Sequence, residues 1–245
     1  MSVKECHKNL NYEYIDWENF SNVNIYENGI CEGKKCPIIV TYKKKKYVLK
    51  EVNKRINYGI DYLVIDKCKQ IFGLNDMNIN IINSNKGLIK KNTKINKYAN
   101  NCKIDNKNCI YCMMYYWDNI GDMRTYIDIV DNDTIYQCIK IILFDGLFLS
   151  SDNIIRNILI NQNHELLSID EDDLFGKTKY IFGKSPWCKK EKFREMLYNI
   201  IKEFMDNKEI IKTKVNKIFI KYNLNYSDIF NYRIDNFKDI VESEF

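Results

Sequence analysis

The most constraining feature of this sequence is a segment with three oxygen-bearing side chains around a short predicted hairpin. Asp152 and Asn157 precede the apolar run 158–160, residues 161–164 are polar, and a second apolar run ends at Asp170. Two short apolar runs joined by a polar turn predict a β-hairpin, which would bring Asn157 and Asp170 close together. Carboxylate and amide oxygens are the ligands that Mg²⁺ prefers in proteins. The segment therefore predicts a magnesium site at the open end of the hairpin.

The spacing Asp152-x4-Asn157 and the interval from Asn157 to Asp170 resemble the catalytic loop and metal-binding aspartate of kinase-fold enzymes. The Asn-Ile-Leu-Ile strand that leads to an Ile-Asp pair is most similar to phosphatidylinositol-kinase-like enzymes, and HipA-like kinases are a more distant likeness. The resemblance implies that Asp152 orients or deprotonates the acceptor hydroxyl and that Asn157 and Asp170 hold Mg²⁺. From the residues alone, the alternative is three solvated turn residues.

The segment also departs from the family pattern at several positions. Ser150-Ser151 stands where kinases carry His-Arg, and Glu171-Asp172 stands where they carry Phe-Gly. Ile154 occupies the position of a His or Lys that stabilises the transferred phosphate, and Arg156 is the substitute that lies nearest in sequence. These departures keep a pseudokinase, which retains the fold without turnover, as an alternative.

A lysine on a predicted strand is the first upstream element of the resemblance. Residues 36–42 and 47–52 are rich in β-branched and aromatic types, and they predict a hairpin around the Lys43–Lys46 turn. Val48-Leu49-Lys50 resembles the kinase strand whose lysine contacts the α- and β-phosphates of ATP. Alternation places Lys50 on the same face as Val48. The alternative is that Lys50 ends a lysine-rich hairpin on the solvent side.

The second upstream element is a predicted helix with a carboxylate on its apolar face. Apolar residues recur at helical spacing from Ile60 to Phe72. Asp61 falls on this apolar stripe, whereas Asp66 falls on the opposite side. A buried carboxylate requires a partner, and Lys50 is a suitable one. In kinase folds this ion pair holds the lysine at the phosphates. The alternative is that Asp61 is only favoured by the positive end of the helix dipole.

The predicted elements, taken in order, indicate an α+β protein with a bilobal protein-kinase-like fold. Residues 1–21 are expected to be an N-terminal extension, residues 22–117 a β-rich N-lobe with one helix, and residues 118–245 a mostly helical, shortened C-lobe. The expected strands cover 23–26, 36–42, 47–52, 77–82 and 109–117, and the expected helices cover 60–72, 131–149, 190–206, 209–222 and 228–245.

The apolar run from Cys109 to Trp117 predicts a buried strand, and by resemblance it enters the hinge where an adenine ring meets the backbone. Met113, Met114 and Tyr115 are the residues expected to line the ATP pocket, although core packing explains them equally well. The pair Cys109-x2-Cys112, with cysteines upstream, could also form a structural zinc site. Buried reduced thiols are the default alternative.

The charge and the distribution of apolar residues limit the kinds of partner that this chain is expected to bind. The net charge of +5 is modest and dispersed, and Lys43–Lys46 is the one tight cluster. It is most simply a solvated turn, with a nucleic-acid or anionic-lipid surface as the alternative; nucleic acid is not an expected partner. The chain has no apolar run that could span a bilayer and no signal peptide, which favours a cytoplasmic location. Abundant Ile, Asn, Lys and Tyr suggest an AT-rich genome such as that of a large DNA virus, so the host cytoplasm or the virion is expected.

Together these patterns predict an ATP- and Mg²⁺-dependent phosphotransferase. It would move the γ-phosphate to a hydroxyl acceptor, on a protein more readily than on a lipid. Two alternatives stay open: a pseudokinase or nucleotide-binding regulatory module, and an unrelated interaction protein.

Overall fold

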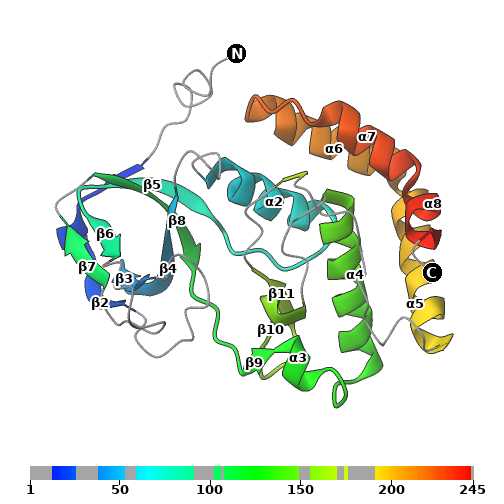
Figure 1. Cartoon of the computed structure of the whole chain (residues 1–245), viewed down its shortest axis with the longest axis horizontal. Coiled ribbons are helices and arrows are strands. Elements are labelled where there is room, and N and C mark those ends of the chain that lie inside the picture. The colour runs from blue at the N-terminus through cyan, green and yellow to red at the C-terminus, as the bar shows by residue number, and fades with distance from the viewer. Residues whose placement is uncertain are drawn as a thin grey trace. The chain divides into compact units, whose positions relative to one another are not determined.

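The structure, a computed structural model, is an α+β protein, so the class expected from the sequence is confirmed (Figure 1). It describes residues 13–25, 38–52, 59–90, 102–105, 108–148, 155–169, 174–175 and 191–243. The chain forms two compact units. The first comprises Met1–Leu63 and Met77–Trp117, and the second comprises Val64–Asp76 and Asp118–Phe245.

The first unit is built on a six-stranded mixed sheet in the order β1-β5-β8-β4-β3-β2. In that order the strands are β1 (Glu13–Ile15), β5 (Asn80–Ser84), β8 (Cys109–Tyr115), β4 (Lys45–Val52), β3 (Ile38–Tyr42) and β2 (Ser21–Ile25). The β1–β5 pair is parallel, and the other pairs are antiparallel. A separate two-stranded sheet pairs β6 (Gly87–Lys90) with β7 (Cys102–Asp105).

Part of the segment expected to be an N-terminal extension belongs to this sheet. Strand β1 pairs with β5, and the short helix η1 (Trp17–Asn19) follows it. Trp17 and Phe20 are buried in the same core cluster as Leu49 and Tyr111. Two large aromatic side chains bury more surface than most residues, which explains why this segment packs against the sheet.

Helix α2 (Ile60–Ile71) begins in the first unit and ends in the second. Every residue from Ile60 to Asp66 is buried. The sequence placed Asp66 opposite the apolar stripe, yet Asp66 is as fully buried as the apolar residues, with no exposed surface. The single-stripe interpretation of this helix is therefore wrong, because its first two turns are covered on all sides.

The second unit is mostly helical, with a small three-stranded sheet in the order β11-β10-β9. The strands are β9 (Gly121–Asp122), β10 (Ile158–Ile160) and β11 (Leu166–Ser168), and the short helix η3 (Ile155–Asn157) precedes β10. The helices are α3 (Met123–Tyr126), α4 (Asn132–Phe148), α5 (Glu191–Asp206), α6 (Lys208–Lys221), α7 (Ser227–Asp235) and α8 (Phe237–Glu242). The hairpin predicted around residues 161–164 and the helix predicted for residues 131–149 are both confirmed.

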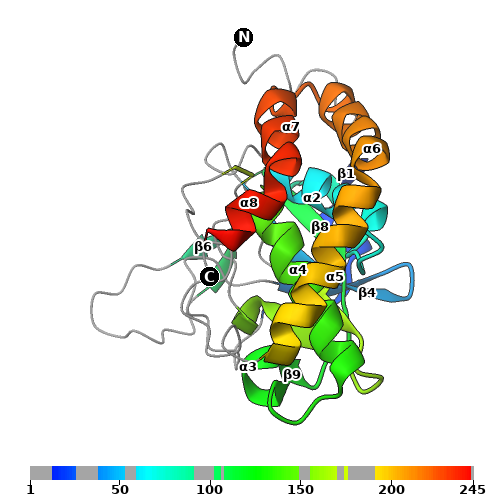
Figure 2. The ribbon, with the colours of Figure 1, turned by 90° about the vertical axis from the view of Figure 1, so that its right-hand side faces the viewer.

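Aromatic side chains form the core of the second unit. Phe148, near the end of α4, has no exposed surface. Its ring lies 4.8 Å from that of Phe144 and 5.2 Å from that of Phe230 on α7, centroid to centroid. Phe204 of α5 joins the cluster through Phe72, at 5.0 Å. Ring pairs at this separation add to the stability gained from burial alone, and they join α4, α5 and α7, which Figure 2 shows close together.

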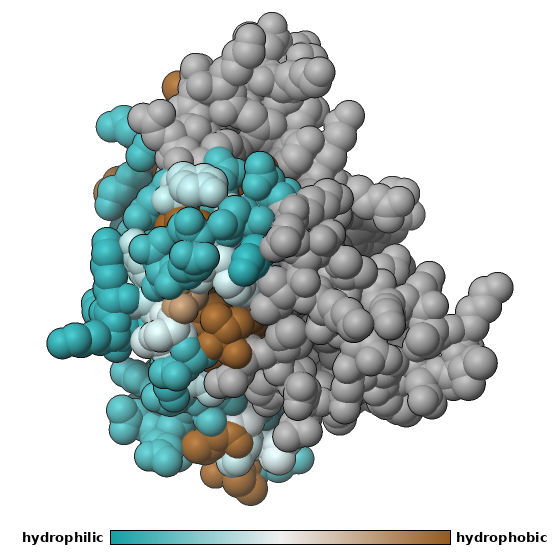
Figure 3. All heavy atoms as spheres, turned by 90° about the vertical axis from the view of Figure 1, so that its left-hand side faces the viewer, coloured by the Kyte–Doolittle hydropathy of each residue, from teal (hydrophilic) through white to brown (hydrophobic). Residues whose placement is uncertain are grey.

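On one face of the molecule the described surface is mainly hydrophilic (Figure 3). On the face shown in Figure 3, hydrophobic residues form small islands that hydrophilic residues separate. Among the helices that the structure describes, none has both the length and the apolar character that a bilayer crossing requires.

Candidate functional site

Lys50 lies on β4, a central strand of the large sheet. It pairs with Cys112 of β8, and β3 lies on the other side of β4. Tyr47 and Leu49 point to one face and belong to the core cluster there. Alternation therefore puts Lys50 on the opposite face, with Val48. Lys50 is half-buried on this face, as the sequence predicted.

The ammonium group of Lys50 is held by a tyrosine of α2. Lys50 Nζ donates a hydrogen bond to the Tyr62 hydroxyl, and it stands 4.6 Å from the centre of the Tyr62 ring. Tyr62 is only 1% exposed. A cation is attracted to the face of an aromatic ring, more strongly when water is excluded. Tyr62 therefore fixes the lysine by two contacts, and it was not among the residues that the sequence singled out.

Asp61, the expected partner of Lys50, is the residue before Tyr62 and is 6% exposed. This burial agrees with the prediction that Asp61 lies on the apolar face of the helix. The Lys50–Asp61 ion pair itself stays a prediction. The sequence did contain a signal for Tyr62. This tyrosine follows the predicted carboxylate Asp61, on the helix that the resemblance connects to the lysine.

The start of α2 approaches the sheet closely at Gly59. Its φ is +86°, and a Cβ built there would stand 2.5 Å from Cys112 Sγ and 3.2 Å from Val52 Cγ2. Only glycine adopts this backbone conformation without strain. Cys112 Sγ also lies 3.8 Å from the Gly59 carbonyl oxygen, to which it donates. Because Cys112 is the cross-strand partner of Lys50, this contact places the helix over the strand that carries the lysine.

Met113 and Tyr115 point away from the Lys50 face. Met113 pairs with Leu49 and is buried in the core cluster on that other face. Tyr115 pairs with Tyr47, and their rings stack at 5.0 Å. Met113 therefore follows the core-packing alternative, whereas the Tyr115 side chain is 37% exposed. The residue between them, Met114, lies on the Lys50 face and pairs with Val48.

The second group of candidate residues lies in the second unit, around β10 and β11. Asn157 is half-buried at the end of η3, and its carbonyl oxygen accepts a hydrogen bond from Ile169 N at 2.8 Å. Ile158 pairs with Ser168, and Ile160 with Leu166. The hairpin therefore has the register that brings Asn157 beside the backbone leading to Asp170. Asp152 and Asp170 themselves lie outside the described residues, and so does Arg156's side chain.

Two side chains hold the outer edge of β11, and the sequence did not single them out. Lys69 Nζ donates to the Ser168 carbonyl oxygen at 2.8 Å, and Asn75 Nδ2 donates to the Leu166 carbonyl oxygen at 2.8 Å. Lys69 has no exposed surface. A lysine between polar neighbours on a helix is usually a solvent-facing residue, which is why sequence patterns conceal it.

The described cysteines are free thiols. Cys68, Cys112 and Cys138 are buried, and Cys109 is half-buried. Burial raises the pKa of the Cys68 and Cys138 thiols well above the ordinary value. Across the described ranges no three His, Cys, Asp or Glu side chains are grouped as metal ligands. Cys31 and Cys36 lie outside these ranges.

The Lys43–Lys46 cluster forms an exposed hairpin turn between β3 and β4. Lys43 and Lys44 adopt positive φ angles of 47° and 66°, as a two-residue turn of the type that suits hairpins requires. Lys45 Nζ stands 5.2 Å from the Tyr115 ring centre, and Lys46 Nζ stands 5.3 Å from that of Tyr116. These contacts suit the solvated turn that the sequence favoured.

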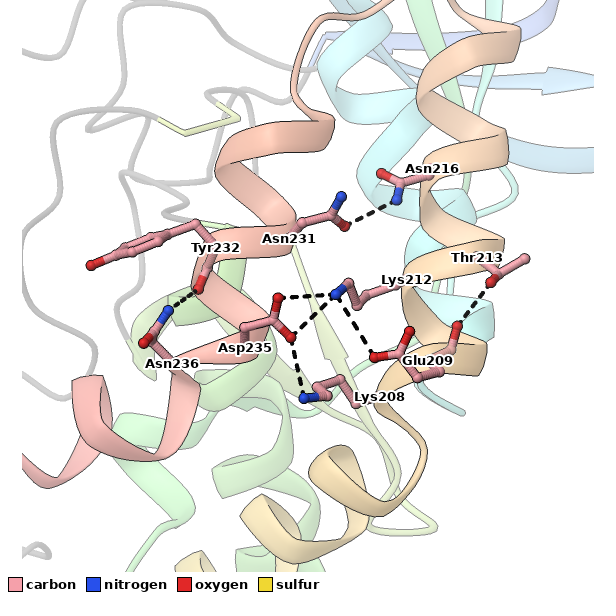
Figure 4. A network of polar contacts seen from close by, with 9 residues as sticks. All are labelled: Lys208, Glu209, Lys212, Thr213, Asn216, Asn231, Tyr232, Asp235 and Asn236. Atoms are coloured by element: carbon pink, nitrogen blue, oxygen red, sulfur yellow. Dashed lines mark hydrogen bonds and ion pairs between the residues drawn. The ribbon is translucent and has the colours of Figure 1, made fainter.

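A polar network joins α6 and α7 (Figure 4). Lys212 Nζ lies 2.9 Å from Asp235 Oδ2, and Lys208 Nζ lies 3.2 Å from Asp235 Oδ1. The hydrogen bond from Lys212 is the main cause that lowers the pKa of the Asp235 carboxyl. Asn216 Nδ2 donates to Asn231 Oδ1 at 3.0 Å. The network is at the surface, and its function is to pair the two helices.

Comparison with known proteins adds no relative: no family model matches the sequence, and a search of curated proteins finds no match.

Proposed function

We propose that this chain is an ATP- and Mg²⁺-dependent phosphotransferase of bilobal kinase-like fold. It would transfer the γ-phosphate to a hydroxyl group, on a protein more readily than on a lipid. One observation carries the proposal: Lys50, on a central strand, is held by the helix that follows it in the chain. Kinase folds require a strand lysine that a helix holds at the phosphates.

The surroundings of Lys50 suit a phosphate ligand. An ammonium carries three N–H donors, and the Tyr62 hydroxyl accepts from one of them. The ring face attracts the cation without neutralising its charge. Tyr62 therefore orients Lys50 while leaving it positive, as binding of the α- and β-phosphates requires. Asp61, buried beside Tyr62, is proposed to complete the holding of the lysine.

Asn157 suits one ligand position for Mg²⁺. Its amide oxygen is a hard donor of the kind this cation binds, and the hydrogen bond from Ile169 N fixes its backbone. Asp170 is proposed as the second ligand, because it follows Ile169 directly. When bound, Mg²⁺ neutralises charge on the phosphates during transfer. Asp152 is proposed to orient the acceptor hydroxyl or to take its proton.

The test combines nucleotide binding with phosphate transfer. We would measure Mg-ATP binding by calorimetry and γ-phosphate transfer to the protein itself, to carrier proteins and to phosphoinositide vesicles. Lys50→Met should weaken binding, with Lys46→Met as control, because Lys46 lies on the same strand but is exposed. Asp170→Asn should lower transfer at least about 100-fold, the size of effect expected when a transition-state contact is removed. Asp173→Asn is the control for that change.

Three outcomes separate the hypotheses. Transfer that Asp170→Asn abolishes supports the phosphotransferase. Binding of Mg-ATP without transfer to any acceptor replaces it with the pseudokinase, which the departures at Ser150-Ser151 and Ile154 favour. A protein that neither binds Mg-ATP nor responds to Lys50→Met refutes both.

A further inference from the structure

Lys69 is a fully buried ionisable residue of the second unit. It lies in the last turn of α2 and has no exposed surface. Lysine is almost never fully buried unless its charge is paired and hydrogen-bonded. Its ammonium donates to the Ser168 carbonyl oxygen at 2.8 Å. Asp66, equally buried, lies three residues earlier, which is the spacing of neighbours on a helix surface.

The target of Lys69 is set by the hydrogen-bond pattern of the hairpin. Ile169 N donates to Asn157 O, so residues 157 and 169 form a hydrogen-bonded pair of the antiparallel ladder. Such pairs alternate with pairs whose N–H and C=O groups point away from the partner strand. Ser168 and Leu166 belong to the second kind, so their carbonyl groups face the outer edge of β11, the last strand of its sheet.

Lys69 and Asn75 satisfy those two outward carbonyl groups. Ser168 and Leu166 are 3% and 1% exposed, and a buried carbonyl without a donor costs free energy comparable to a lost hydrogen bond. The backbone of β11 is therefore held on both sides at consecutive residues. Lys69 binds Ser168 from the outer edge, and Asn157 binds Ile169 from the inner edge. Asp170 is the next residue in the chain.

We propose that Lys69 is a positioning residue for the metal ligands, acting through the Ser168 carbonyl group. This inference rests on the proposed function, because it takes Asn157 and Asp170 as ligands of Mg²⁺. By holding Ser168, the ammonium supports the adjacent Asn157–Ile169 hydrogen bond and, through it, the backbone position of Asn157. Groups that orient metal ligands without touching the metal typically change metal affinity or activity by about 10–100-fold when they are removed.

The test uses Lys69→Met, which keeps most of the side-chain volume and removes the donor. Lys67→Met, on the same helix and only half-buried, is the matched control. Lys69→Gln keeps a neutral donor of shorter reach, and it serves if Lys69→Met does not fold. Mn²⁺ binding in the presence of a non-hydrolysable ATP analogue is measured directly, as is the affinity for the analogue without metal. Amide hydrogen exchange is followed in peptides that cover residues 155–169.

Lys69→Met should weaken Mn²⁺ binding about 10-fold or more, speed exchange in these peptides, and leave metal-free binding of the analogue unchanged. Lys67→Met should match the wild-type protein. Faster exchange with unchanged metal affinity makes Lys69 a purely structural residue and overturns the proposal. Unchanged exchange overturns it as well. Because metal binding is measured without turnover, a protein that shows the expected loss of Mn²⁺ affinity but never transfers phosphate refutes the proposed function alone.

Discussion

Replacing Gly59 by alanine tests whether the start of α2 is fitted to the sheet. Two costs add. A non-glycine residue in the left-handed region loses about 1–2 kcal/mol, and Gly59 has φ +86°. The new Cβ would also stand 2.5 Å from Cys112 Sγ, and overpacking of this kind costs about 1–3 kcal/mol. We therefore expect Gly59→Ala to lower the free energy of unfolding by about 2–5 kcal/mol.

Gly73→Ala provides the matched control. Gly73 has φ +66°, but nothing lies within 4 Å of a Cβ built there, so only the conformational cost of about 1–2 kcal/mol applies. Both variants are unfolded in urea and followed by circular dichroism and tyrosine fluorescence. Adding Cys112→Ala to Gly59→Ala should recover part of the loss, since it removes the clashing sulfur. Equal destabilisation by the two glycine variants, or no recovery in the double variant, would refute the proposed contact.

Three further changes test other contacts. Arg233 donates to the Gly146 and Leu147 carbonyl oxygens at 2.7 and 3.0 Å, near the end of α4; Arg233→Ala should cost about 1.5–3 kcal/mol in urea unfolding, and no change would contradict this cap. Tyr62→Phe keeps the ring but removes the hydroxyl that binds Lys50, so calorimetry should show Mg-ATP affinity lower by about tenfold. Asp131 accepts from Thr134 N, which is the main cause of its lowered carboxyl pKa. Its folded pKa lies below its unfolded one, so its contribution is complete above pH 4 or so and is lost as the pH falls through the folded value. Asp131→Asn still caps the helix but has no carboxyl group, so Tm of the variant should fall less than that of the wild-type protein as the pH is lowered. If Tm falls equally in both proteins, Asp131 does not contribute to the acid sensitivity.

Alternation and helical spacing located most of the regular structure. They placed β3, β4, β8, α4 and the β10–β11 hairpin, because each of these elements contains an apolar run or an apolar stripe that polar turn residues bound. They also gave the correct face for Lys50. Strand β1 was missed because only Ile15 of its three residues is buried, so it has no apolar run, whereas the equally short β10 and β11 are mostly apolar and buried. The start of β5 was displaced because Met77 is buried without belonging to the strand.

The candidate site was less accessible from the sequence, and each error has a physical cause. Asp66 was placed outside the apolar stripe because periodicity assumes a helix with one covered side, whereas the first two turns of α2 are buried all round. Met113 and Tyr115 were expected to line the ATP pocket, with core packing as an equal alternative, because the strand register that sets their face relative to Lys50 comes from pairing with β4. Lys69 acts through a contact with a residue 99 positions away, which no local pattern reveals.

The capped edge of β11 has a further consequence for solubility. An open strand edge is a template on which another chain can add a strand, and proteins protect such edges to avoid aggregation. Here the protection is provided by an amine and an amide that occupy the two outward oxygens of Ser168 and Leu166. Because Ser168 and Leu166 are also buried, this edge is covered as well as hydrogen-bonded. A molecule that lost both donors would keep two buried carbonyl groups without partners, so local loosening of β11 would come first, and an edge open to another chain would follow from it.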